Sequence, residues 1–224
     1  MNFCSSCGSK VTLLIPAGDN RRRFVCNECG MIHYQNPNVV TGCIPEWGDK
    51  ILLCKRAIEP RYGTWTLPAG FMENGESSMF GAAREAQEEA NAELRDLKLF
   101  CVFSIPHINQ VYTMYRGVLH QGLASPGEES LEFKLVAEDD VPWDRLSFPV
   151  IMETLRLYYE DRKTGNFSTH YGEIIRLDQK TTRVEHYLTG FVQSRRNRPL
   201  TQRAIINLPQ RHGEQGAVMC LHTG

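Results

Sequence analysis

Three glutamates, Glu85, Glu88 and Glu89, crowd into a short segment directly after Arg84. If the segment is helical, their carboxylates share one side of the helix and repel each other unless a cation lies between them. Carboxylate oxygens are the ligands that Mg²⁺ and Mn²⁺ prefer, and both ions also coordinate phosphate. The spacing therefore predicts a site for a divalent cation. The alternative is a solvated acidic helix face on which Arg84 pairs with Glu88 one turn later.

A helix is predicted over residues 77–91 to position these carboxylates. Pro68-Ala69-Gly70 interrupts the chain before it, and either Ser77 or Ser78 is a suitable N-cap. The glutamates are expected on the side opposite an apolar stripe. That stripe has four members: Met79, Ala83, Ala86 and Ala90.

The spacing around this helix resembles the Nudix box of the Nudix hydrolases. Gly70 is followed after five residues by Glu76, after seven more by Arg84-Glu85, and after two more by Glu88-Glu89. Several positions at fixed separations are far more specific than one short motif. The family has glycine where this chain has Asn91, and asparagine is the next most tolerant residue of a left-handed backbone. This departure removes no metal ligand.

The resemblance implies an α/β/α sandwich that catalyses metal-assisted attack of water on a phosphoanhydride. In the family, the carboxylates that correspond to Glu85, Glu88 and Glu89 hold Mg²⁺ or Mn²⁺. The main-chain carbonyl of the residue before the box glycine, here Ala69, can be a further ligand.

Outside the box, a downstream glutamate often completes the metal site or acts as the base. Glu132 matches that position best and Glu129 second, although a lone glutamate can also be a polar residue at a strand end. We expect Arg84 to orient the carboxylates by charge-assisted hydrogen bonds. Glu76 is its expected structural partner.

Four cysteines form a separate pattern, Cys4-x-x-Cys7 and Cys26-x-x-Cys29, with eighteen residues between the two pairs. This spacing predicts a zinc ribbon with a tetrahedral site of four thiolates. The zinc should be structural, because four protein ligands leave no open position for a substrate. Two disulfides or a redox-active pair are the alternatives.

The chain is expected to contain three regions: the ribbon (1–36), a Nudix hydrolase domain of α/β class (37–175) and a C-terminal extension of unknown structure (176–224). Within the middle region a hairpin is predicted around Trp47-Gly48-Asp49, and a second helix is predicted from Phe148, ending at Lys163-Thr164-Gly165. Further strands are predicted at 100–105, 111–119 and 132–136.

The substrate is indicated by resemblance alone. Residues 1–175, including Tyr34-Gln35-Asn36-Pro37 and the stretch Gly63–Gly70, are similar to zinc-ribbon Nudix enzymes of the plant chloroplast FAD pyrophosphatase subgroup, which also cleave ADP-ribose. This implies hydrolysis of FAD to AMP and FMN, or of ADP-ribose to AMP and ribose 5-phosphate. NADH pyrophosphatase activity and removal of NAD caps from RNA are alternatives, although the sequence signature of NADH pyrophosphatases is absent after the box. A non-catalytic nucleotide sensor or RNA-binding Nudix protein is the alternative of another class.

The formal charge of −1 over 224 residues indicates no general affinity for nucleic acid or membranes. From Leu177 onward, however, seven lysines and arginines face three acidic residues, so RNA binding through this basic tail is an alternative to a solvated tail. No signal peptide or membrane-spanning stretch is recognisable. We therefore expect a cytoplasmic homodimer that acts on a small nucleotide diphosphate.

Overall fold

The computed structural model describes residues 1–178, 181–187 and 203–207. The chain divides into two compact units, Met1–Pro37 and Asn38–Gly224. Several basic residues of the predicted tail (Lys180, Arg195, Arg196, Arg198 and Arg211) lie outside the described residues, as does Cys220. Among the described residues, no helix has the length and apolar character needed to cross a membrane.

The smaller unit is a three-stranded antiparallel sheet, β1 (Val11–Leu14), β2 (Arg23–Cys26) and β3 (Ile32–His33). Each cysteine pair lies in a tight turn. The N–H of Gly8 donates to the carbonyl of Cys4 at 3.0 Å, and the N–H of Gly30 donates to that of Cys26 at 3.2 Å. Both glycines have a positive φ, 74° and 70°, which residues with a side chain rarely adopt. The two turns therefore present their cysteines in the same way.

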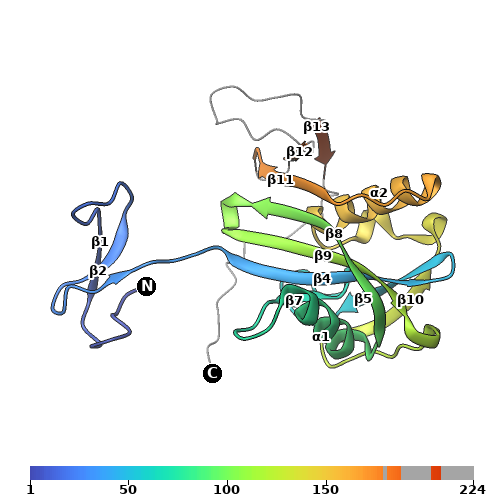
Figure 1. Ribbon diagram of the computed structural model, residues 1–224, viewed down its shortest axis with the longest axis horizontal. Coiled ribbons are helices and arrows are strands. Elements are labelled where there is room, and N and C mark those ends of the chain that lie inside the picture. The colour runs from blue at the N-terminus through green and yellow to red at the C-terminus, as the bar shows by residue number, and fades with distance from the viewer. Residues whose placement is uncertain (179–180, 188–202, 208–224) are drawn as a thin grey trace. The chain divides into compact units, whose positions relative to one another are not determined.

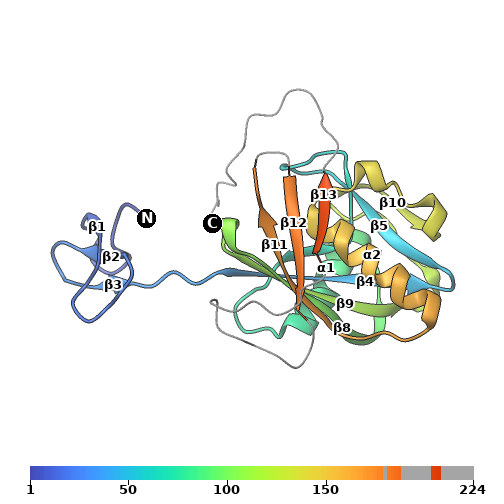
Figure 2. The same cartoon turned by 90° about the horizontal axis from the view of Figure 1, so that it is seen from above.

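The larger unit is built on one mixed sheet with the strand order β10-β5-β4-β9-β8-β11-β12-β13, and β6 and β7 pair with β5 and β4 (Figures 1 and 2). Its strands are β4 (Asn38–Trp47), β5 (Lys50–Arg56), β6 (Trp65–Thr66), β7 (Ala69–Phe71), β8 (Leu94–Ile105), β9 (Gln110–Leu119), β10 (Ser130–Val136), β11 (His170–Arg176), β12 (Thr181–Tyr187) and β13 (Arg203–Asn207).

Two helices, α1 (Ser78–Ala90) and α2 (Pro149–Thr164), cover opposite faces of this sheet (Figure 1). Side chains alternate between the faces along each strand. In β4, Cys43 belongs to the apolar cluster under α1, and its neighbour Ile44 belongs to the larger cluster under α2. The predicted α/β/α sandwich is thus confirmed.

The predicted apolar stripe of α1 was wrong at its N-terminal end. Met79 is 40% exposed, and the helix instead packs on the sheet through Ala82, Ala86 and Ala90. This rotation brings Glu85 and Glu89, only 7% and 6% exposed, to the buried side next to those alanines. Small alanines let the helix approach the sheet closely, so the two carboxylates are enclosed rather than presented to solvent.

The predicted hairpin and second helix are present. Trp47 pairs with Lys50 across the turn at Gly48, and α2 ends at Gly165, whose φ is 70°. Strands β11 and β12 were not predicted. They extend the sheet beyond β8, with β11 parallel to β8 and antiparallel to β12.

Candidate functional site

Helix α1 is capped at both ends, by the side chain of Ser77 and by the backbone of Asn91. The N–H of Phe80 donates to the Ser77 hydroxyl at 3.3 Å, so Ser77 is the N-cap. Asn91 adopts the left-handed conformation at the C-terminus, with φ 46° and ψ 36°. Its side-chain amide also donates to the carbonyls of Ser125 at 3.3 Å and Pro126 at 3.2 Å. A glycine could provide the backbone conformation but not these bonds, which hold the loop before β10 against the helix end.

Arg84 is the centre of an ion-pair network at the start of this site. Its guanidinium donates to Glu76 at 2.9 and 3.1 Å, to Glu85 at 2.9 Å and to Glu88 at 2.7 Å. A further hydrogen bond of 3.2 Å reaches the carbonyl of Phe71 in β7. The hydrogen bonds from Arg84, followed by that from the Glu73 N–H, lower the pKa of Glu76. Arg84 thus fixes the carboxylates of α1 relative to β7.

The box glycine is required by a close approach between β7 and α1. A Cβ on Gly70 would overlap both carboxylate oxygens of Glu85. Glycine at this position therefore lets the Glu85 carboxylate lie flat against the β7 backbone. Any larger residue would displace the carboxylate or separate the helix from the strand.

The two enclosed carboxylates have strongly raised pKa values. Burial raises the pKa of Glu85 to about 7, against the opposing effect of Arg84. Burial, and then repulsion from Glu85, raises the pKa of Glu89 to about 8. Such a pair of buried like charges is stabilised by a cation, and its oxygen donors suit Mg²⁺ or Mn²⁺. Glu88, with a side chain 57% exposed, lies at the rim of the same cluster.

The remaining predicted site residues differ in what they contact. The N–H of Ala69 donates to Glu89 at 3.4 Å, so the backbone of Ala69 is directly beside the carboxylates. Glu132 is instead paired with Lys55 and Lys134, each at 3.3 Å, and the hydrogen bonds from these two lysines lower its pKa. The charge of Glu129 adds to the repulsion that raises the pKa values of both Glu85 and Glu89.

Sequence reasoning did not single out Arg56, which ends β5. Its positive charge opposes the increase in the pKa values of both Glu89 and Tyr112, so Arg56 contributes to the electrostatics of the same site. The Arg56 Nε donates to the carbonyl of Pro60 at 3.0 Å, and the guanidinium lies over the ring of Phe148. Within the described part of the chain, Arg56 forms no ion pair. The signal that the sequence offered for Arg56 was a basic residue at the end of an apolar strand.

The four cysteines of the ribbon converge as predicted. Their sulfur atoms all lie within 4.8 Å of one another, with Cys4 and Cys29 3.8 Å apart and Cys7 and Cys26 3.4 Å apart. Zn–S bonds of about 2.3 Å in a tetrahedron require sulfur–sulfur distances of roughly 3.8 Å, so the cluster fits zinc. His33 Nε2 lies 3.3 Å from the sulfur of Cys4, where it can donate to a metal-bound thiolate.

Comparisons with known proteins agree with this architecture. A model of the NUDIX domain matches residues 36–154, and a zinc-ribbon model described as Nudix N-terminal matches residues 2–35. A crystal structure of a NUDIX hydrolase from Nitrosomonas europaea has a TM-score of 0.76 and 51% identity, covering 79% of this chain and 100% of that chain. A second NUDIX hydrolase from the same organism has a TM-score of 0.50 at 20% identity, which supports the fold alone.

Curated relatives carry a functional name. The NAD-capped RNA hydrolase NudC of Pseudomonas aeruginosa is 28% identical over 149 residues, which are 64% of this chain and 51% of the relative. NudC of Photobacterium profundum is 32% identical over 103 residues, 44% of this chain and 35% of the relative. The chain thus spans about half the length of the first relative and about a third of the length of the second. Since the NUDIX model covers more than half of the chain, the protein belongs to the Nudix family.

Proposed function

We propose that this protein is a metal-dependent pyrophosphatase that hydrolyses the phosphoanhydride of a nucleoside diphosphate linked to another moiety. The observation that carries the proposal is the enclosed pair of Glu85 and Glu89, with pKa values raised to about 7 and about 8. Enclosure of two like charges costs stability, so the arrangement is explained by a function that a cation completes. A bound Mg²⁺ or Mn²⁺ would supply charge neutralisation of the diphosphate and a more acidic water.

The residues around this pair have separate roles in the proposal. Glu85, Glu88 and Glu89 hold the cation, with the carbonyl of Ala69 as a further ligand, and Arg84 keeps their carboxylates in place. Arg56 binds a substrate phosphate, because its charge acts on Glu89 and its guanidinium forms no ion pair among the described residues.

The base that deprotonates the attacking water is proposed to be Glu129 rather than Glu132. The charge of Glu129 contributes to the raised pKa values of both buried carboxylates, whereas Glu132 forms ion pairs with two lysines. The two residues form a matched pair for a test. The Glu129→Gln variant should lose on the order of a hundredfold or more in kcat, and Glu132→Gln should stay close to the parent protein. The reverse ranking would assign the base to Glu132.

FAD and ADP-ribose are the first substrate candidates, from the resemblance to the plant chloroplast subgroup. NAD-capped RNA is supported by the name of the curated relatives, and NADH is a candidate because it contains the same type of pyrophosphate as the cap. All four contain a pyrophosphate bridging AMP to a second group, so one metal site can serve each of them. Turnover of these four substrates with Mg²⁺ or Mn²⁺, with products identified by chromatography, tests the proposal. Cleavage of the pyrophosphate in none of them, under conditions where the protein is folded and loaded with metal, would favour a non-catalytic nucleotide sensor.

Removal of NAD caps from RNA is the second candidate function. It would require RNA contacts beyond the cap, for which the basic tail from residue 177 is proposed. Deletion of residues 188–224 should then reduce turnover of NAD-capped RNA selectively and flatten its salt dependence, while NADH turnover is unchanged. Equal losses on both substrates would show a structural role for the tail. The expected homodimer is a proposal that sedimentation equilibrium can check.

A further inference from the structure

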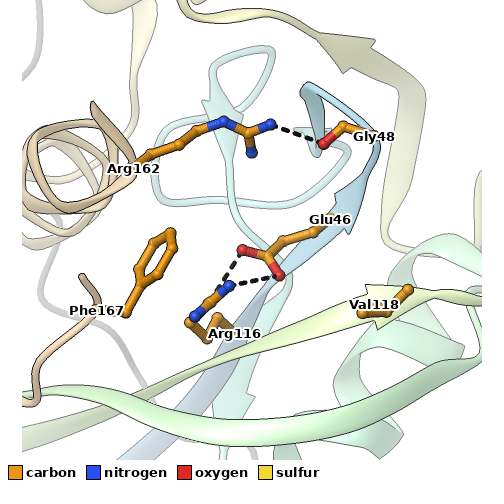
Figure 3. Close-up of a pocket in the computed structure, with 6 residues that line it drawn as sticks. All are labelled: Glu46, Gly48, Arg116, Val118, Arg162 and Phe167. Carbon is orange, nitrogen blue, oxygen red and sulfur yellow. Dashed lines mark hydrogen bonds and ion pairs between the residues drawn. The ribbon is translucent and has the colours of Figure 1, made fainter. Parts of the chain in front are cut away.

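A pocket separate from the carboxylate site lies at the C-terminal end of α2. Its volume is about 440 Å³, and Figure 3 shows its lining: Glu46, Gly48, Arg116, Val118, Arg162 and Phe167. Arg162 comes fourteen residues after Phe148, the N-cap of α2 that lies beside Arg56, which is roughly 20 Å along the helix. The volume falls within the range of small-molecule sites. None of the lining residues contributes to the carboxylate cluster.

Arg162 enters this pocket in a fixed position. Its guanidinium donates to the hydroxyl of Tyr158 at 2.6 Å and to the carbonyl of Gly48 at 2.7 Å. Tyr158 is fully buried, and Gly48 is the turn residue of the β4–β5 hairpin. The arginine therefore links the end of α2 to the hairpin and loses little further freedom when it binds a ligand.

Arg116 lies on the opposite side of the pocket, and its contacts also fix its position (Figure 3). It donates from two nitrogens to the carboxylate of Glu46, at 3.1 and 3.2 Å. Its guanidinium also stacks on Phe167, 3.4 Å from the ring centroid. A stacked, doubly bonded guanidinium is oriented before any ligand arrives.

The pocket has an excess of positive charge and of hydrogen-bond donors. Two arginines face one glutamate, and Lys98 on β8 lies opposite Arg116 in the sheet register. The two guanidiniums have ten N–H groups. Within the described part of the chain, the two guanidiniums donate four hydrogen bonds. The other six N–H groups form no hydrogen bond with the described residues.

We infer that this pocket is a second, non-catalytic binding site for a small ligand that carries a phosphate group. A tetrahedral phosphate presents three terminal oxygens and can accept from two guanidiniums that approach from different elements. A planar carboxylate matches one guanidinium fork and would leave the other without a partner. The inference concerns residues outside the proposed catalytic site and stands independently of the reaction.

Calorimetric titration of the full-length protein tests the site. Inorganic phosphate, AMP and acetate are added in separate titrations without added divalent cation, so that no cation links a phosphate to the glutamates of α1. We expect saturable binding of inorganic phosphate, of AMP or of both, and much weaker binding of acetate. Tighter binding of AMP than of inorganic phosphate would identify a nucleotide as the source of the phosphate. No saturable binding of either, or equal binding of acetate, would overturn the inference.

Substitutions in and near the pocket test whether phosphate binds there. Arg162→Met should weaken phosphate binding by roughly ten- to a hundredfold, the effect of losing a hydrogen-bonded charge. Lys163→Met is the matched control: it removes one charge from the same helix turn, but Lys163 pairs with Glu138 at 2.8 Å outside the pocket. Equal binding by Arg162→Met and the parent protein would refute the site. If Arg162→Met does not fold, Val118→Trp should block binding by filling the pocket, with Leu123→Trp, at an exposed position that does not line it, as control.

Discussion

The substitution Glu89→Gln should stabilise the metal-free protein while it abolishes hydrolysis. Glu89 has an ordinary pKa of 4.5 in the unfolded chain and a pKa raised by burial to about 8 in the folded protein. The folded protein therefore holds the proton more tightly, so its stability is fully present below pH 4.5 and is lost as the pH rises through 8. At about 1.4 kcal/mol for each pH unit, the loss reaches about 4 kcal/mol at pH 8.

The amide in the variant cannot ionise and avoids this loss. It is still a buried polar group with few partners, so we expect about half of the effect, about 2 kcal/mol. For a protein of this size, 2 kcal/mol corresponds to an increase in Tm of roughly 4–8 °C at pH 8. At pH 5 the carboxyl of the folded parent is already protonated and the ionisation loss is below about 1 kcal/mol, while the cost of the amide remains, so the Tm of the variant should be slightly below that of the parent.

Thermal unfolding followed by tryptophan fluorescence is the suitable assay. All three tryptophans, Trp47, Trp65 and Trp143, belong to the larger unit, so unfolding of the ribbon does not contribute to the signal. Addition of Mg²⁺ at pH 8 should raise the Tm of the parent protein more than that of the variant. Turnover should fall on the order of a thousandfold. Glu88→Gln, at an exposed position of the same cluster, is the control and should leave the metal-free Tm unchanged.

Three outcomes would contradict this reasoning. A Tm of Glu89→Gln below that of the parent at pH 8 would show that the carboxylate is stabilising without a cation. An equal change at pH 5 and pH 8 would show that ionisation is not the cause. Near-normal turnover would remove Glu89 from the proposed metal site.

Three further substitutions test the supports of the site. Gly70→Ala should displace the Glu85 carboxylate and lower kcat by about a hundredfold, measured at saturating Mg²⁺; unchanged turnover would mean that the close approach is unimportant. Asn91→Ala should lower the free energy of unfolding by roughly 1–2 kcal/mol in urea titrations, and Asn91→Gly by less, because glycine restores the left-handed cap but not the bonds to Ser125. Cys4→Ser should release zinc, detected by metal analysis, with secondary effects on turnover; full zinc retention would refute the four-thiolate site.

Much of the fold could be predicted from local sequence signals. Ser77 and Asn91 delimit α1, Gly48 marks the hairpin and Gly165 ends α2, because each position depends on the conformational preference of one residue and its immediate neighbours. The cysteine spacing likewise predicted a four-sulfur cluster, since a tight turn fixes each pair. Strands β11 and β12 were not predicted, and the parallel pairing that adds β11 to the sheet joins His170 to Cys101, far earlier in the chain, which no local signal encodes.

The sequence by itself determined which residue types meet near α1: three glutamates, one arginine and one glycine at fixed spacing. Only the tertiary structure decided which carboxylates are enclosed. Periodicity placed all three glutamates on an outer face, but packing through Ala82, Ala86 and Ala90 turns Glu85 and Glu89 toward the sheet. Burial then raises their pKa values. The fold also brings Arg56, from a strand about thirty residues earlier in the chain, close enough for its charge to act on Glu89. Local spacing cannot encode this, because desolvation depends on everything that packs around a group rather than on its neighbours along the chain.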